Sequence, residues 1–172
     1  MKNIIISMFT LFTTCAFAQV AIGKASVSSP SVSLEFGTGN KGILLPWVTG
    51  VSTVTGAVNG TLVYNTTDKK VYVKYASGWK DLSVDATGIV DTTLQDSKND
   101  SASAKVMIGG NPDTDTTPGI LVLADTNKAM VLPKVASPHL NIVNPAAGMM
   151  VYDTVKKQLA IFNGTVWSFW KP

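Results

Sequence analysis

Residues able to carry out acid–base or nucleophilic chemistry are few in this sequence and stand far apart. His139 is the only histidine, Glu35 the only glutamate and Cys15 the only cysteine. Nucleophilic catalysis needs a base beside the nucleophile, and acid–base catalysis needs two titratable groups in distinct environments. His139 lies in a Ser-Pro-His-Leu segment, the sequence has no G-x-S-x-G motif, and Glu35 alternates with apolar residues. We therefore expect no catalytic residues, no cofactor and no enzymatic activity.

Residues that could bind a metal are equally sparse. Zinc has no set of Cys and His ligands. Asn111, Asp113 and Asp115 alternate as oxygen donors, which is compatible with calcium. This run lacks the glycine and the closing glutamate of an EF-hand loop. We expect a solvated polar loop at these residues, and no metal site.

The charge of the chain argues against nucleic acid as a partner. There are 14 basic and 11 acidic residues, the formal net charge is +3, and every basic residue is a lysine. Arginine is the usual residue for bidentate contacts with phosphate and guanine. Scattered lysines instead keep the surface and the strand edges of a β-rich protein soluble.

Aromatic side chains offer the most room for a binding function. Trp47 and Trp170 have no counterpart in the other half of the chain, and exposed rings of this kind could stack on sugars. They are the candidate binding aromatics, although a small β-core needs large aromatic side chains as well. Both interpretations stay open for these two residues. For Trp79 and Trp167 we favour the core, with both side chains mostly buried.

A segment that occurs twice organises the chain. Residues 60–79, GTLVYNTTDKKVYVKYASGW, recur at 148–167 as GMMVYDTVKKQLAIFNGTVW. Each copy has two apolar runs, a polar break, and then a glycine and a tryptophan, which is typical of a β-hairpin that leads into a third strand. Equal spacing preserves register, because a slip of one residue turns every side chain to the opposite face. The structural anchors of this repeat are Gly60, Tyr64, Trp79, Gly148, Tyr152 and Trp167.

The repeat extends beyond these segments. V-x-I-G, N-K and L-P recur in the same order, at offsets that grow from 86 to 88 residues. We predict an all-β chain in which residues 19–82 and 106–172 are two copies of a small antiparallel β-meander. The polar linker 83–105 joins them, with Ile89, Val90 and Leu94 available to dock. Units of roughly 60 to 65 residues have marginal cores, so packing together or self-association is expected.

Local patterns inside the units predict two further features. Residues 31–36 alternate between apolar and polar types, which predicts a half-buried strand with Ser33 and Glu35 on its polar face. The stretch 138–147 has room for one helical turn after Asn144-Pro145, because proline suits the first helical position. We expect little other helix.

The first eighteen residues have the pattern of a secretory signal peptide. Lys2 precedes an apolar stretch, and Ala16-Phe17-Ala18 is a small-x-small cleavage site. We expect an exported protein in the periplasm, on the outer-membrane surface or outside the cell, without a transmembrane span in the mature chain. Lipid attachment at Cys15 is the alternative to simple cleavage.

The combination of V-x-I-G, NKGILLP, GTLVYNTTDKKVYV and G-x-W resembles a family of secreted, largely uncharacterised proteins of Bacteroidota, with similar segments in phage tail-fibre and trimeric-adhesin-like proteins. The residue after L-P, commonly basic in that family, is Trp47 in the first unit and Lys134 in the second. The resemblance implies a structural, adhesin- or fibre-like role at the cell envelope or outside it. Its partners would be further copies of the chain, a trimer being one form, or another envelope protein.

Two alternatives accompany this interpretation. The first is a glycan-binding module that uses the exposed aromatics. The second concerns modification: four Asp-Ser/Thr-apolar or Asp-Thr-Thr triplets are similar to O-glycosylation acceptors of exported proteins in the same bacteria, and they are equally compatible with plain polar loops. These triplets are Asp91-Thr92-Thr93, Asp100-Ser101-Ala102, Asp115-Thr116-Thr117 and Asp153-Thr154-Val155.

Overall fold

The computed structural model describes residues 19–98, 101 and 104–171. The predicted signal peptide 1–18, with Cys15, lies outside the described residues. The described chain is built almost entirely of strands, with a single α-helix and a short 3-10 turn, which confirms the all-β prediction. In chain order the elements are β1 (Val20–Ile22), β2 (Val32–Phe36), β3 (Ile43–Leu44), β4 (Trp47–Val48), η1 (Val51–Thr53), β5 (Leu62–Asn65), β6 (Lys70–Tyr75), β7 (Gly78–Asp81), β8 (Val106–Ile108), β9 (Leu121–Leu123), β10 (Ala129–Val131), β11 (Lys134–Val135), α2 (Pro138–Asn141), β12 (Met149–Asp153), β13 (Gln158–Phe162) and β14 (Trp167–Trp170).

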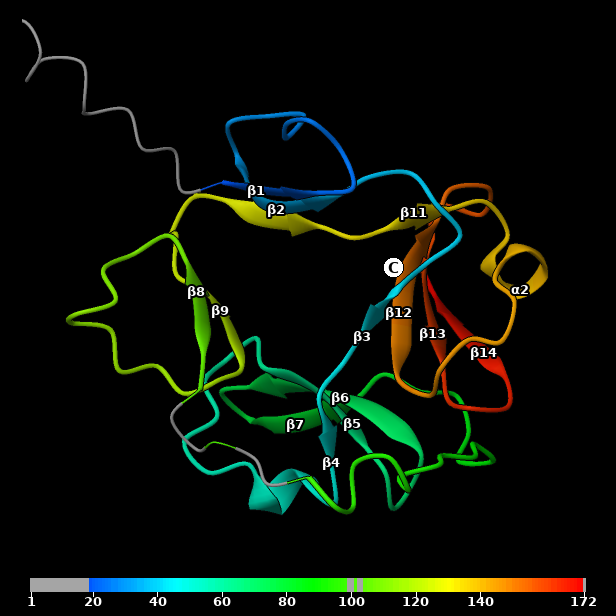
Figure 1. Cartoon of the computed structure of the whole chain (residues 1–172). Helices are drawn as coiled ribbons and strands as arrows, with labels where there is room; N and C mark the ends of the chain where they lie inside the picture. The colour runs from blue at the N-terminus through cyan, green and yellow to red at the C-terminus, as the bar shows by residue number, and fades with distance from the viewer. Residues whose placement is uncertain (1–18, 99–100, 102–103, 172) are drawn as a thin grey trace, which may run out of the picture.

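The described strands form four small sheets (Figure 1). One has the order β1-β2-β10, a second β4-β5-β6-β7, and a third β11-β12-β13-β14 with β3 added to β12. The pair β8-β9 forms the fourth sheet and lies on the opposite side of the view from β11–β14 (Figure 1).

The two predicted hairpins are present and pair in the same way. Strands β5, β6 and β7 form one antiparallel meander, and β12, β13 and β14 form another. Tyr64 pairs with Val71 and Tyr152 with Leu159, so the two pairs correspond at an offset of 88 residues. At the far end, Trp79 and Trp167 pair with the corresponding residues 74 and 162. The Gly-to-Trp spacing therefore does maintain strand register.

Even the turns of the two meanders share an unusual backbone conformation. Lys69 has φ of 64° and Lys157 has φ of 53°, at corresponding positions of the two hairpins. Few non-glycine residues adopt a positive φ, because the Cβ atom crowds the following carbonyl oxygen. The residue that opens each turn caps it: Asn65 Oδ1 accepts the amide of Thr67, and Asp153 Oδ1 accepts that of Val155.

Each meander is extended by a short parallel strand, a feature that the sequence did not indicate. Strand β4 pairs with β5, and β11 with β12. The amides of Tyr64 and Tyr152 donate to the carbonyls of Pro46 and Pro133, in both cases over 2.9 Å. Parallel pairs also join β1 with β2, β10 with β2, and β8 with β9. The fold is thus a combination of antiparallel meanders and parallel pairs.

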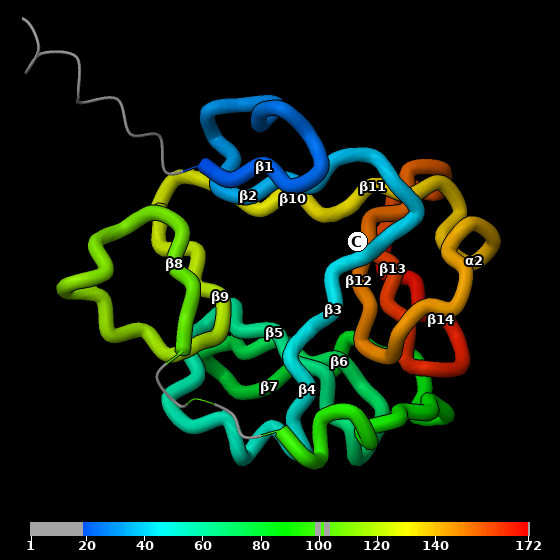
Figure 2. The backbone as a smooth tube through the Cα atoms, in the orientation of Figure 1, coloured from blue at the N-terminus to red at the C-terminus, as the bar shows by residue number. Residues whose placement is uncertain are grey.

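Strands cross between the two halves of the chain. Strand β3 of the first half pairs with β12 of the second, at Leu44 with Met149 and Ile43 with Met150. In return, β10 of the second half adds to β2 of the first. The backbone path makes this visible: β3 descends beside β12 before it reaches β4 (Figure 2). The main core cluster accordingly contains residues from both halves, namely Leu45, Tyr64, Val71, Leu82, Ala147, Met150 and Ile161.

Two local predictions need correction. The strand predicted to be half-buried is covered on both faces: Ser33 and Glu35 are buried together with Val32 and Leu34. The expected polar face is covered because Lys24 and Ser28 contact Glu35, and Asp125 contacts Ser33. The helical turn lies earlier than expected. It spans Pro138–Asn141 and begins at Pro138, whose fixed φ suits the first helical position.

Candidate association surface

The two halves of the chain meet in a contact that we term the seam. It joins Trp47 and Tyr64 of the first half to Ala147, Gly148 and Asn163 of the second. The side chain of Tyr64 is fully buried, and its hydroxyl donates a hydrogen bond of 2.7 Å to the carbonyl of Asn163. Its ring lies over Gly148: a Cβ atom there would be only 2.9 Å from Cβ and Cγ of Tyr64. Gly148 has φ of 81°, so both the backbone conformation and the contact require glycine.

Trp47 also belongs to this seam. Its indole N–H donates a 2.9 Å hydrogen bond to the carbonyl of Ala147, and its ring lies 6.3 Å from that of Tyr64 between centroids. The side chain is half-buried against the main core cluster. As a candidate binding aromatic, Trp47 therefore has its polar edge directed into the protein, where it joins the two halves.

Burial changes the acidity of the tyrosines in the first meander. Removal from water raises the pKa of Tyr64 to about 12, and the charge of Asp68 acts in the same direction. Burial also raises the pKa of Tyr72, whose hydroxyl donates to Asp68 over 2.6 Å. Both phenols are thus neutral at ordinary pH, and Tyr64 brings no charge into the contact between the two halves.

Four side chains of the first half form what we term the inner row. Adjacent strands place them side by side on one face of the sheet, since paired residues share a face. Tyr64, Val71 and Leu82 are buried in the main core cluster, and Trp47 packs against it. The row runs across β4, β5 and β6 and ends just after β7. The inner row is Trp47, Tyr64, Val71 and Leu82.

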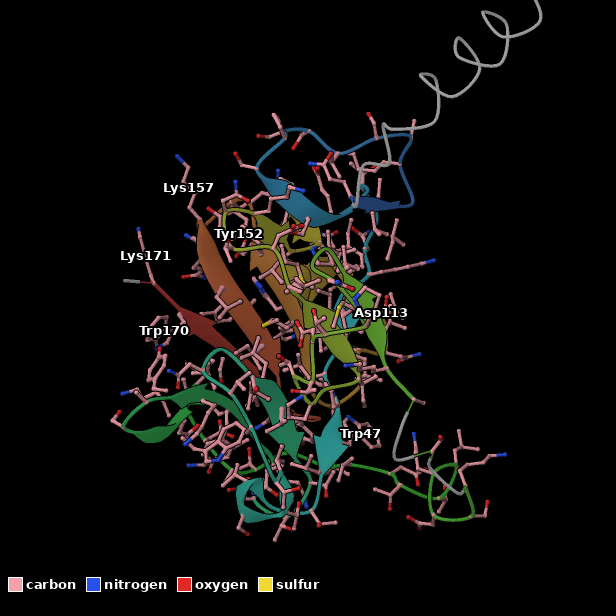
Figure 3. All side chains as sticks on the ribbon, turned by 90° about the vertical axis from the view of Figure 1, so that its left-hand side faces the viewer. Trp47, Asp113, Tyr152, Lys157, Trp170 and Lys171 are labelled. Carbon is pink, nitrogen blue, oxygen red and sulfur yellow. The ribbon has the colours of Figure 1, made fainter. Side chains whose placement is uncertain are left out.

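The corresponding residues of the second half, which we term the outer row, are much more exposed. Tyr152 is 36% exposed, Trp170 is 46% exposed, and Lys134 is exposed as well. Leu159, between the two aromatics, is half-buried. Figure 3 shows Tyr152 and Trp170 on the same side of the molecule. Strand pairing aligns Lys134, Tyr152, Leu159 and Trp170 across β11–β14.

The outer row is the candidate functional surface. It combines two aromatic rings, an aliphatic side chain and a lysine on the face of a sheet. Exposed apolar patches with a polar rim mark sites of protein association or ligand binding. Of the predicted residues, Tyr152 and Trp170 are brought together here, whereas Trp47, Tyr64 and Gly148 are brought together inside the seam. The sequence pattern indicated Tyr152 only as a residue that fixes the strand register of the repeat.

The two other predicted tryptophans, Trp79 and Trp167, are partly exposed, but most of the surface of each is covered, as we expected. Trp167 contacts the second core cluster, and its ring lies 5.3 Å from that of Phe162. The ammonium group of Lys74 lies over the ring of Trp79, 6.0 Å from its centroid. Gly60, the last of the repeat anchors, is exposed.

The residues considered for chemistry do not converge. Glu35 accepts hydrogen bonds from the Lys24 ammonium at 2.7 Å and the Ser28 amide at 2.6 Å, which lower its pKa to about 2. The exposed His139 meets Phe169 edge to face. Asn111 caps a local turn through the amide of Asp113. Among the described residues, no group of three or more His, Cys, Asp or Glu side chains could hold a metal ion.

Part of the linker is attached to the second half, a feature that its polar composition concealed. Asn163 Nδ2 donates to Asp85 Oδ1 over 2.7 Å, and Thr165 donates to the carbonyl of Thr87 over 2.9 Å. Val90 packs against the main core cluster, whereas Ile89 and Leu94 keep exposed side chains. The triplet Asp91–Thr93 is a hydrogen-bonded turn, in which Thr93 donates to Asp91. The triplet at Asp100 lies partly outside the described residues.

An all-β chain with an internal seam and an exposed counterpart of it fits the class of structural proteins that associate with further copies. Comparison with family models supports this class and makes it specific: the model of the phage tail like trimerisation region matches residues 21–100 and 108–171. The chain belongs to this family. Membership supports self-association as a trimer and fits a structural, fibre-like protein.

Searches of curated proteins and of solved structures gave no significant match. No helix in the described part of the chain has the length and apolar character needed to cross a membrane.

Proposed function

We propose that the protein is a non-enzymatic structural component that assembles as a trimer and contributes a fibre- or adhesin-like element to the cell envelope or its exterior. The observation that carries the proposal is the outer row, in which Tyr152 and Trp170 are exposed although their counterparts in the first half, Tyr64 and Leu82, are buried. Membership of a trimerisation family supports the same conclusion.

The two halves support the proposal through their correspondence. We infer that they are two copies of one unit, since their parallel strands correspond at an offset of 87 residues and their hairpins and turns at an offset of 88. Within one chain the first copy has its aromatic row covered by the second. In the second copy Leu159 packs against the main core cluster, but Lys134, Tyr152 and Trp170 stay exposed, which leaves an unsatisfied association surface on each chain.

Light scattering after size-exclusion chromatography tests the trimer. We expect a species with three times the mass of the chain at micromolar concentration. A strictly monomeric species over the accessible concentration range would contradict the proposal. Assays for hydrolytic turnover are expected to show no activity.

Export is the second element of the proposal. Its support is the sequence pattern of residues 1–18 and the resemblance to secreted proteins. N-terminal sequencing of the protein recovered from the cell envelope or the medium should begin at Gln19. Recovery only from the cytoplasm, with residues 1–18 retained, would contradict it.

Glycan binding remains a second candidate, favoured by the exposure of Trp170. In this alternative Trp170 stacks on a sugar ring, and its fluorescence should change when glycans are added. A glycan array would then give binding that is lost in Trp170→Ala and retained in Val143→Ala, a substitution at an exposed site just after helix α2.

A further inference from the structure

We propose that the trimer repeats, between chains, the seam that joins the two halves within a chain. The outer row of one copy packs on the first half of a second copy, just as the inner row packs on the second half of its own chain. This inference rests on the proposed function for the existence of the trimer, and it assigns the surfaces that meet.

The glycines beneath the tyrosines give the first line of support. Gly148 is buried under Tyr64, whereas its counterpart Gly60 is exposed, and a Cβ atom built on Gly60 would have no atom within 4 Å. Both glycines have a positive φ, 81° and 91°. Both amides are held alike: Gly148 N–H donates to Phe162 and Gly60 N–H to Lys74, each over 2.8 Å. Gly60 therefore has the backbone conformation and the free space that a tyrosine ring needs. In the trimer, the exposed Tyr152 of one copy packs on Gly60 of another copy, as Tyr64 packs on Gly148 within one chain.

An open strand edge gives the second line of support. The edge of β12 at Met149 and Met150 is paired by β3. The corresponding edge of β5, at Thr61 and Leu62, has no strand partner in the described chain. The counterpart of β3 is β10, which within the described part of the chain pairs along one edge only, with β2. Strand β10 of a neighbouring copy therefore fits the open edge of β5.

The edge of β9 completes the set. In the first half β2 is flanked by β1 and β10, whereas among the described strands β9 of the second half pairs only with β8. The strand that would complete β9 is the counterpart of β10, which is β3. Strand β3 has a single partner within the described residues, β12. The open edge of β9 is apolar, because Leu121 and the preceding Ile120 are exposed. An exposed edge of this kind is a template for pairing with a further strand.

A single arrangement of two neighbouring copies makes all three contacts at once: Tyr152 on Gly60, β10 on β5, and β9 on β3. Each copy contributes its outer row, β9 and β10, and receives a neighbour on Gly60, β5 and β3. Because the contributing and receiving surfaces differ, the contact is heterologous, and such a contact forms a closed ring when its rotation allows. The Tyr152 hydroxyl then takes the role of Tyr64 and donates to the carbonyl of Tyr75, the counterpart of Asn163.

A disulfide across the predicted strand pair tests this arrangement. Within the chain, Leu45 N–H donates to the carbonyl of Gly148, so the next pair, Leu44 with Met149, is a non-hydrogen-bonded pair. Side chains approach most closely in such pairs, which suits disulfide geometry. The counterparts are Val131 and Thr61. The double variant Thr61→Cys/Val131→Cys, in a chain that also carries Cys15→Ser, is oxidised and analysed on a non-reducing gel.

We expect a covalent ladder that ends at three chains and collapses on reduction. A mixture of the two single variants should give only two-chain adducts, and either single variant alone should give none. Thr61→Cys combined with Val143→Cys is the matched control and should give no ladder. A trimer by light scattering without this cross-link, or with a disulfide closed inside one chain, would overturn the assigned surfaces but leave the proposed function intact. A monomer would overturn both.

The outer row supplies an independent test without cysteines. Tyr152→Ala and Trp170→Ala should each raise the concentration at which the trimer dissociates by about tenfold or more, as truncation of central aromatic anchors does. Val143→Ala is the control and should leave that concentration unchanged, while circular dichroism reports retained β structure in all three. Trimers of unchanged affinity in both aromatic variants would overturn the proposal.

Discussion

The hydroxyl of Tyr64 donates to the main-chain carbonyl of Asn163 at 2.7 Å, across 99 positions of the sequence. This bond joins the first meander to the end of β13, inside a fully buried region. It makes Tyr64 the residue on which the two halves depend most directly, and it leads to the first prediction.

Tyr64→Phe should destabilise the protein by roughly 1 to 3 kcal/mol, because it leaves a buried carbonyl without its donor. The ring and its packing remain, so the change isolates the hydrogen bond. Denaturant unfolding followed by tryptophan fluorescence measures the difference. Val143→Ala is the control, since Val143 is exposed, and it should change stability by less than about 0.5 kcal/mol. Equal effects of the two substitutions would show that the bond contributes nothing.

Gly148→Ala should cost more than the same change at Gly78. Both glycines have a positive φ, so alanine is strained at either position. Only at position 148 would the added Cβ meet Tyr64, at 2.9 Å. Overpacking of this kind typically costs about 1 to 3 kcal/mol beyond the backbone strain. Thermal melts of the two variants give the comparison, and equal melting temperatures would contradict the described contact.

Acid should weaken the fold partly through Glu35. Hydrogen bonds from Lys24 and Ser28 lower its pKa to about 2, from an ordinary value of 4.5. The folded state therefore binds fewer protons than the unfolded state between these two values, and stability falls as the pH drops from about 5 toward 2. Urea midpoints measured across this range should show the fall, with a smaller slope in Glu35→Gln. An unchanged slope in that variant would assign the acid sensitivity to other carboxyl groups.

The turn at Lys157 offers a stabilising substitution. Its φ of 53° is costly for a residue with a Cβ atom, and the side chain is exposed. Lys157→Gly should therefore raise stability by roughly 0.5 to 1 kcal/mol, after the greater freedom of glycine in the unfolded chain is subtracted. The matched control Lys156→Gly, at a position without a positive φ, should lower stability. Calorimetric melts of both variants decide, and a loss at position 157 would refute the argument.

How far the sequence predicted this fold depended on the range of the interactions. The meanders could be predicted because residues 60–79 and 148–167 carry turn residues, alternation and fixed spacing within a short segment. Strands of two or three residues, such as β3 and β10, carry no such signal. Their pairing with β12 and β2 is decided by tertiary packing, and so is the burial of Glu35, which alternation placed on a solvated face.

The candidate surface was predicted only in part. Trp170 was identified by its lack of a counterpart, and the structure shows it exposed. The same argument selected Trp47, whose indole is used in the seam instead. Spacing reveals that two positions correspond, but it does not reveal which copy is covered. The inner row is covered because the second half packs on it, whereas the outer row is left largely exposed. This difference depends on how the two halves pack in three dimensions, which the spacing of residues does not encode.

The exchange of β3 and β10 between the halves has a consequence for synthesis of the chain. When Tyr64 leaves the ribosome, its acceptor Asn163 is still 99 residues away, which at about 5 to 20 residues per second means a wait of roughly 5 to 20 seconds. During this wait the inner row is uncovered, and β2 lacks the strand that closes its second edge. The first half thus presents an apolar face and an open strand edge to its surroundings until the second half is available to cover them.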